Sequence, residues 1–269
     1  MRIIAIHDKL VIETFARRNP YLFLYELGDL DDFFWPYTVW YGLEDGGEII
    51  ELALFYTDVE PPVVLAHTMT SAETMGRLLQ GLQRALPQKF FSHLDSNGVT
   101  ALGGAHVHSH GAYFKMGLTD RARVASDRSA EGYKVQPLHV CDLDQIVAFY
   151  DQAYPGNWFV PRMLETGCFY GAIDSAGVLA AVAGIHVYSP LYKAAALGNI
   201  ATLPGHRGRG LATAVTAALC AHLLARDIEH IGLNVRADNA TAIRCYSGLG
   251  FSLIAEYGEY MVTQRAIDA

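Results

Sequence analysis

The fold is decided by the stretch Leu197-Gly-Asn-Ile-Ala-Thr-Leu-Pro-Gly-His-Arg-Gly-Arg-Gly-Leu-Ala-Thr213. Its first residues predict a strand, and the alanine-rich run after Gly210 predicts a helix. The turn between them has little side-chain bulk and two arginines, Arg207 and Arg209. Backbone N–H groups and the positive end of a helix therefore meet at one point, which indicates an anion-binding site.

Length and composition limit what this site can serve. The chain has 269 residues, 51% hydrophobic and 18% charged, so two well-packed domains are expected. The net charge of -8 disfavours a nucleic-acid partner. The four cysteines form no Cys-x-x-Cys pair. The N-terminus lacks the apolar run of a signal peptide, and no segment has the ~20 apolar residues that span a bilayer. We expect a cytoplasmic monomer or homodimer with no membrane partner.

The two halves of the chain have the same order of predicted elements. Residues 9–94 predict two helices, a strand hairpin, a strand, a helix and a strand. An opening strand and then the same order follow within residues 133–262, which suggests an internal duplication. The polar section 119–131 lacks periodicity. We therefore expect domains over residues 1–120 and 133–269, joined by a linker over 121–132. Only the second copy contains the glycine-arginine turn.

Two common phosphate-binding turns do not match this stretch. A P-loop requires Gly-Lys followed by Ser or Thr, whereas Gly210 is followed by Leu211 and Ala212. A dinucleotide-binding turn requires a third glycine and a parallel βαβ unit. Here Gly208 and Gly210 are followed by Thr213, and a predicted hairpin precedes them. The sequence disfavours both interpretations.

Two motifs in the second half resemble the signatures of the GNAT superfamily of acyl-CoA-dependent N-acyltransferases. Arg207-Gly-Arg-Gly210-Leu-Ala212 matches Arg/Gln-x-x-Gly-x-Gly/Ala. Asn239-x-x-Ala242-x-x-x-Tyr246-x-x-x-Gly250-Phe251 is similar to the second signature, at the expected spacing. The resemblance covers residues 133–262. The arrangement of the whole chain, a degenerate first copy followed by an intact second copy, is similar to that of tandem GNAT proteins. The second half resembles the glycine N-acyltransferase branch. The implied fold is α/β, with two tandem GNAT-like domains that are each a twisted mixed sheet flanked by helices.

The resemblance also implies how acetyl-CoA would be held as co-substrate. Backbone N–H groups of the turn would bind the pyrophosphate, and Ile200 and Thr202 would pair with the pantetheine arm. Asn239 would bond the pantetheine, while Tyr246 would protonate the departing thiolate as the catalytic acid. The expected cofactor-binding residues are Ile200, Ala201, Thr202, Arg207, Gly208, Arg209, Gly210, Leu211, Ala212, Thr213, Asn239 and Tyr246.

The base that deprotonates the amine is left open by the sequence. Residues 197–202 include no acidic side chain, so water, His186 and Glu165 all stand as candidates. Separately, His106, His108 and His110 alternate along a predicted strand at a spacing that suits zinc. No carboxylate or cysteine partner follows them at a suitable interval, so we expect no metal.

These features together lead to one expected function. The chain is expected to transfer an acetyl group from acetyl-CoA to a small-molecule amine or amino acid held between the two halves, by direct attack in a ternary complex. No cysteine lies in a recognisable nucleophile–base pair, so no acyl-enzyme is expected. The first domain is expected to form part of the substrate pocket or to be structural. The alternatives are a non-catalytic acyl-CoA-binding or sensor protein and a protein N-acetyltransferase.

Overall fold

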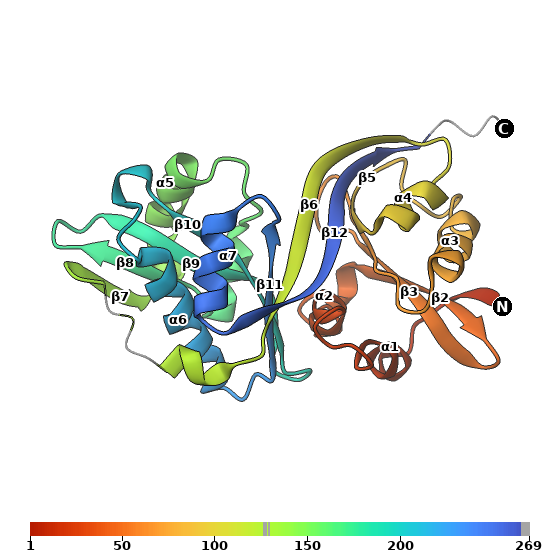
Figure 1. Cartoon of the computed structure of the whole chain (residues 1–269), viewed down its shortest axis with the longest axis horizontal. Helices are drawn as coiled ribbons and strands as arrows, with labels where there is room; N and C mark the ends of the chain where they lie inside the picture. The colour runs from red at the N-terminus through yellow and green to blue at the C-terminus, as the bar shows by residue number, and fades with distance from the viewer. Residues whose placement is uncertain (126–127, 129, 265–269) are drawn as a thin grey trace. The chain divides into compact units, whose positions relative to one another are not determined.

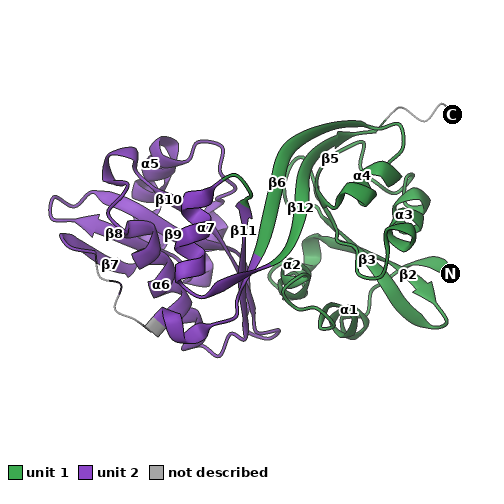
Figure 2. Cartoon of the chain, viewed as in Figure 1, with its two compact units in different colours: residues 1–115, 236–238, 254–269 green, residues 116–235, 239–253 purple. Residues whose placement is uncertain are grey.

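The computed structural model describes residues 1–125, 128 and 130–264 of the chain (Figure 1). Contacts between residues divide the chain into two compact units (Figure 2). Unit 1 comprises Met1–Lys115, Arg236–Asp238 and the residues from Ile254 onward, and unit 2 comprises Met116–Val235 and Asn239–Leu253. Among the described residues, no helix is long and apolar enough to cross a membrane.

The units divide the chain differently from the ranges 1–120 and 133–269 expected from the sequence. The reason is β12 (Phe251–Thr263), which begins in unit 2 and ends in unit 1. There Gly258 to Thr263 pair antiparallel with β5. Of the expected linker 121–132, residues 126, 127 and 129 lie outside the described residues. The roles expected for the two domains remain predictions.

Unit 1 is a mixed sheet with helices packed against it. Its strands lie in the order β1-β2-β3-β4-β5-β12-β6. Neighbouring strands from β1 to β4 are antiparallel, whereas β4 and β5 are parallel and are connected by α3. The elements are β1 (Arg2–Ala5), α1 (Lys9–Ala16), α2 (Leu24–Gly28), η1 (Trp35–Tyr37), β2 (Thr38–Asp45), β3 (Glu48–Tyr56), β4 (Val63–Ala66), α3 (Ala72–Gly81), β5 (Lys89–Leu94), α4 (Ser96–Ala101) and β6 (His106–Leu118).

One face of the unit 1 sheet is an apolar core. Strand alternation directs Val64, Ala66, Phe90 and Val262 to this face, where they pack with the buried side chains of α3 and α4. Ser71 begins α3 as its N-cap by accepting a hydrogen bond from the Thr74 backbone N–H. The apolar stripe of α3 therefore faces the sheet.

Unit 2 repeats this arrangement. Its strands lie in the order β7-β8-β9-β10-β11, again antiparallel except for the last pair, and α6 connects the parallel strands β10 and β11. The elements are η2 (Arg121–Ala125), β7 (Tyr133–Pro137), η3 (Val140–Asp142), α5 (Leu143–Ala153), η4 (Pro161–Thr166), β8 (Tyr170–Asp174), β9 (Leu179–Ser189), β10 (Ala194–Thr202), η5 (Pro204–His206), α6 (Leu211–Leu224), β11 (His230–Arg236) and α7 (Ala240–Gly248).

The shared strand order confirms the predicted fold of two tandem domains, each a mixed α/β sheet with helices. In unit 2, α6 contacts β8, β9 and β10 and buries Leu211, Val215, Leu219 and Leu223. Because this helix is held along its whole length, its first turn is fixed at the end of β10. The glycine-arginine stretch is therefore positioned by the core of unit 2.

Candidate active site

The turn between β10 and α6 presents backbone N–H groups at a helix end. Gly208 (φ +77°) and Gly210 (φ +76°) both adopt the left-handed conformation, which glycine reaches without strain. Gly210 is the N-cap of α6 and has no side chain that could accept from the first-turn N–H groups. The first turn also has no acidic residue. The N–H groups and the helix dipole therefore give this turn the chemistry of an anion site.

Both arginines of the turn are exposed and are anchored through one nitrogen each. The Arg209 Nη1 donates to the Tyr133 hydroxyl at 2.8 Å, and that hydroxyl lies 2.8 Å from the His206 Nδ1. The Arg207 Nε donates to the Thr202 carbonyl oxygen at 3.3 Å. The remaining N–H groups of each guanidinium are oriented donors that suit a phosphate. Tyr133 was not among the residues that the sequence indicated.

Strand β10 leaves regular pairing just before this turn. Its parallel pairing with β11 covers four residue pairs and ends at Leu197. The register with β9 then shifts beyond Gly198, and Asn199 in this bulge has φ +54°. The pairing with β11 thus does not extend to Ile200 and Thr202, the residues expected to pair with the pantetheine arm.

A buried tyrosine holds the bulge in place. The Tyr150 hydroxyl, on α5, donates to the Asn199 carbonyl oxygen at 2.6 Å. The Asn199 side chain is 3% exposed, and its Nδ2 contacts the Met163 Sδ at 3.5 Å. Sequence reasoning missed both Tyr150 and Asn199. An asparagine inside an apolar strand pattern was the available signal, because asparagine is rare in strands and tolerates positive φ.

Helix α7 carries the second pair of predicted residues. Asn239 is its N-cap, and the Asn239 Oδ1 accepts from the Ala242 backbone N–H at 3.1 Å. Its side-chain amide N–H groups are not used in this cap, so they suit a ligand carbonyl. Tyr246 is 8% exposed, and its ring packs edge-on against Phe251 with 6.0 Å between centroids. Burial, with a smaller contribution from Cys245, raises the pKa of Tyr246. The phenol therefore stays protonated at neutral pH, as a general acid requires.

Most of the predicted residues lie at the N-terminal end of α6, and the part of α7 that carries Tyr246 contacts it there. The Thr213 Oγ1 lies 3.1 Å from the Cys245 Sγ, so the turn of α7 that carries Tyr246 lies against the first turn of α6. The others follow one another along the chain: Ile200, Ala201 and Thr202 end β10, Arg207, Gly208, Arg209 and Gly210 form the turn, and Leu211, Ala212 and Thr213 begin α6.

The two side chains considered as the base differ in environment. His186 is the extra residue in a β-bulge of β9, and its ring lies directly against the Cα of Gly198 on β10. Burial lowers the pKa of His186 to about 4, so its imidazole is neutral at physiological pH. Glu165 is exposed in η4. His186 thus lies beside the irregular end of β10, while Glu165 faces solvent.

The three alternating histidines lie on β6 and are exposed. The rings of His108 and His110 are 5.1 Å apart between centroids. Within the described part of the chain, no group of three or more His, Cys, Asp or Glu side chains is arranged to hold a metal ion.

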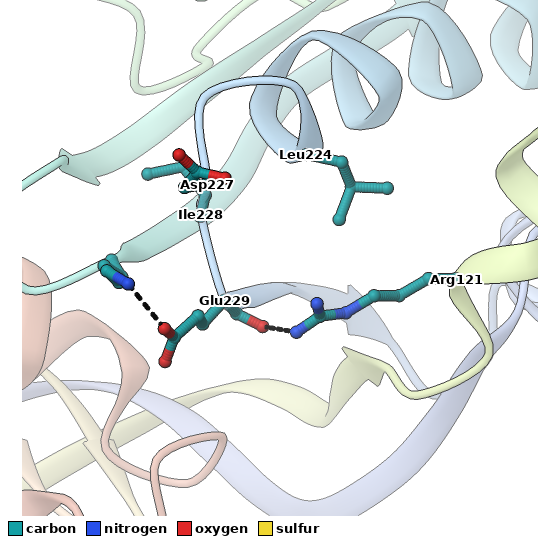
Figure 3. Close-up of a pocket in the computed structure, with 6 residues that line it drawn as sticks. Arg121, Leu224, Asp227, Ile228 and Glu229 are labelled. Carbon is teal, nitrogen blue, oxygen red and sulfur yellow. Dashed lines mark hydrogen bonds and ion pairs between the residues drawn. The ribbon is translucent and has the colours of Figure 1, made fainter.

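A pocket of unit 2 with a volume of about 260 Å³ lies at the other end of α6 (Figure 3). Its lining includes Leu224, the last residue of α6, and a 2.7 Å ion pair between Lys193 and Glu229. Arg121 donates to the Glu229 carbonyl oxygen across the same pocket. Helix α6 has 14 residues, so this pocket is roughly 20 Å from the glycine-arginine turn. It is separate from the candidate active site.

The corresponding turn in unit 1 is filled by a side chain of the protein. Between β4 and α3, the Glu51 Oε2 accepts from the Met69 N–H at 2.8 Å. Its Oε1 accepts from the N–H groups of Thr70 and Ser71 at 2.9 and 3.1 Å and from the Thr74 hydroxyl at 2.6 Å. Glu51 is fully buried. The N–H groups left open in unit 2 are thus used internally in unit 1.

Comparison with known proteins supports acyl transfer at a general level. Residues 136–251 match the model of the Acetyltransferase (GNAT) family, a match that covers less than half of the chain and lies almost entirely in unit 2. No curated protein matches the chain.

Solved structures with this fold include a protein described as a tandem GNAT protein. The chain is similar to a GCN5-related N-acetyltransferase from Sphaerobacter thermophilus, with 14% identity, coverage of 99% of this chain and 98% of that chain, and a TM-score of 0.62. It is similar to a tandem GNAT protein from the clavulanic acid biosynthesis pathway, with 14% identity, coverage of 98% and 100%, and a TM-score of 0.59. A protein described as an acetyltransferase of the GNAT family from Novosphingobium aromaticivorans has 21% identity, coverage of 84% and 92%, and a TM-score of 0.58. At these identities the likeness defines the fold alone.

Proposed function

We propose that unit 2 is an N-acetyltransferase that transfers an acetyl group from acetyl-CoA to a primary amine of a small molecule or amino acid. The observation that carries this proposal is the open helix end at Gly210 beside a buried, protonated Tyr246. The first binds a pyrophosphate, and the second supplies a proton to a leaving thiolate.

In this proposal the pyrophosphate of the cofactor lies on the N–H groups of residues 208–213, with Arg207 and Arg209 adding charge. The pantetheine arm continues along the end of β10 that does not pair with β11, at Ile200 and Thr202, and the Asn239 amide bonds it. The amine then attacks the thioester carbonyl directly, the C–S bond breaks, and Tyr246 donates its proton to the coenzyme A thiolate. His186 or water takes the proton that the amine loses.

The further features expected from the sequence belong to this proposal. Unit 1 contributes substrate-pocket or structural residues, the second half belongs to a glycine N-acyltransferase-like branch, and the protein works in the cytoplasm as a monomer or homodimer. The free thiol state of all four cysteines, Cys141, Cys168, Cys220 and Cys245, supports a reducing compartment.

Titration of acetyl-CoA against Arg207→Glu tests the cofactor site. Affinity should fall at least tenfold, because the variant replaces a cation with an anion at a phosphate site. Arg84→Glu is the matched control, since Arg84 is an exposed arginine of unit 1 and its exchange produces the same change in charge. Equal affinities for the two variants would refute the assignment of the turn to acetyl-CoA.

Turnover of Tyr246→Phe tests the acid. Release of free thiol with a panel of amines should slow by about 100-fold, the low end for a general acid, with little change in acetyl-CoA affinity. Tyr56→Phe, which removes a hydroxyl of unit 1 that donates to the exposed Asp58 at 3.4 Å, should keep the full rate. Binding without thiol release for any amine would indicate a sensor instead of an enzyme, and turnover with peptides alone would indicate a protein acetyltransferase.

A further inference from the structure

The second face of the unit 1 sheet carries buried titratable side chains beside apolar ones such as Leu52, Leu54 and Leu65. Strand alternation places His67, His93 and Glu259 opposite the face that carries Val64 and Val262, and Glu259 is the register partner of His93. Buried charged and polar groups of this kind cost free energy unless they are paired, so a face that collects them needs a specific explanation.

Lys115 is the cation at the centre of this group. It lies on β6 and is 2% exposed. Its Nζ is 5.2 Å from the ring centroid of Tyr25 on α2 and 5.5 Å from that of Tyr257 on β12. Burial lowers the pKa of Lys115. The carboxylates of Glu26 and Glu259 act in the opposite direction, to a smaller extent, because they favour the charged ammonium. Two aromatic rings therefore lie against one ammonium group, and two carboxylates act on its charge.

Two buried polar atoms in this group have unused hydrogen-bonding capacity. Glu26 is 1% exposed and His67 is 3% exposed. Neither the Glu26 Oε2 nor the His67 Nε2 has a hydrogen-bond partner among the described residues. A buried carboxylate oxygen in this state requires an N–H or O–H donor. By contrast, the Glu259 Oε1 accepts from the Tyr257 hydroxyl at 3.0 Å.

We infer that these side chains form a binding site for a primary ammonium group, and that Lys115 is its resident ligand. We call this site the ammonium box: Tyr25, Glu26, His67, Tyr257 and Glu259. The rings contact the cation, the carboxylates supply negative charge, and the unused oxygen of Glu26 provides an acceptor for a further N–H. The inference concerns unit 1 alone and does not depend on acetyl transfer in unit 2.

The competing explanation is that the lysine stem only fills space. Its four methylene groups cover apolar surface even without the charge. The two explanations differ in what a truncated variant should accept. A site built for an ammonium group will accept a small amine and discriminate against a neutral molecule of the same shape, whereas a simple gap will accept either.

Lys115→Ala followed by addition of n-propylammonium tests the inference. This amine has the size of the atoms removed, and 1-propanol is its neutral counterpart. Unfolding of unit 1 is read by the fluorescence of Trp35 and Trp40 in a Trp158→Phe background, because those two are the tryptophans of unit 1. The variant should melt roughly 10 °C lower than the parent, since it leaves buried carboxylates without their cation.

Millimolar n-propylammonium chloride should restore at least half of that loss, and 1-propanol should restore none. Lys115→Met, which fills the box without charge, should be destabilised and should not respond to the amine. Lys89→Ala removes an exposed lysine of the same unit and controls for general effects of the amine. Equal rescue by 1-propanol, or no rescue by either compound, would overturn the inference. Should Lys115→Ala fail to fold, the refolding yield with each compound gives the same comparison.

Discussion

Glu259 should make the stability of unit 1 depend on pH near neutrality. Burial raises the pKa of Glu259 from its ordinary 4.5 to about 7, while hydrogen bonds from Tyr257 and Tyr113 lower it to a smaller extent. The titratable and charged groups that face it come from every neighbouring element: Tyr257 on β12, His93 on β5, Tyr113 and Lys115 on β6, Tyr25 on α2, and Arg236.

The size of the effect follows from the two pKa values. The folded protein binds the Glu259 proton more tightly than the unfolded chain does, so this group stabilises unit 1 fully below pH 4.5 and the contribution is lost as the pH rises through about 7. The difference between 7 and 4.5, at 1.36 kcal/mol for each pKa unit, gives about 3 kcal/mol in total. About 2.5 kcal/mol of this should disappear between about pH 5 and about pH 8.

Comparison with Glu259→Gln isolates this term, because glutamine keeps the shape and does not titrate. Urea unfolding of both proteins in the Trp158→Phe background, followed by the fluorescence of Trp35 and Trp40, should give a free energy of unfolding that falls more steeply with pH in the parent. Other groups of the ammonium box titrate in both proteins, so their effects largely cancel in the difference. Parallel pH profiles for the two proteins would refute the argument, because they would show that Glu259 binds its proton equally in the folded and unfolded states.

Three further predictions concern unit 2. Gly198→Ala should destabilise it by about 1–3 kcal/mol, because a Cβ there would collide with the ring of His186, and thermal unfolding read by Trp158 would show this loss. Tyr150→Phe should cost about 1–2 kcal/mol and raise the KM for acetyl-CoA, because the buried carbonyl of Asn199 loses its donor and the bulge of β10 is released; an unchanged KM would show that the bulge does not position the cofactor. Titration calorimetry should find one coenzyme A for each chain, and a stoichiometry of two would contradict the internal use of the unit 1 turn by Glu51.

Local signals were enough to predict the centre of the candidate site. The strand, turn and helix over residues 197–224 and the Asn239 cap each depend on residues close in sequence, so periodicity and capping chemistry revealed them. The two bulges were not predictable in the same way. Whether His186 or Asn199 is the extra residue of a strand depends on its register with the neighbouring strand, and one strand alone does not contain that information.

The C-terminal strand shows the same limit on a larger scale. Its strand character was predicted from Phe251 onward, but not the unit in which it ends. The pairing of Gly258 to Thr263 with β5 spans most of the chain, and it is selected because Val262 then enters the apolar core of unit 1. The Gln264 side chain secures this end by donating to the carbonyl oxygens of Leu86 and Pro87 at 2.8 and 3.0 Å. A non-local choice of this kind has no local sequence signal.

The two units place different groups at the corresponding turn of one framework. Each has a helix between two parallel strands, and each has backbone N–H groups in the turn that leads into this helix. In unit 2, glycines at 208 and 210 leave those groups open and two arginines add charge. In unit 1, the buried carboxylate of Glu51 takes the N–H groups of residues 69–71, and Lys115 supplies an ammonium to the opposite face of the sheet. A phosphate in unit 1 would have to displace a carboxylate that makes four hydrogen bonds, two of them within 2.8 Å. The asymmetry between the two units therefore arises from ligands that unit 1 provides for itself, and it does not require a loss of the fold.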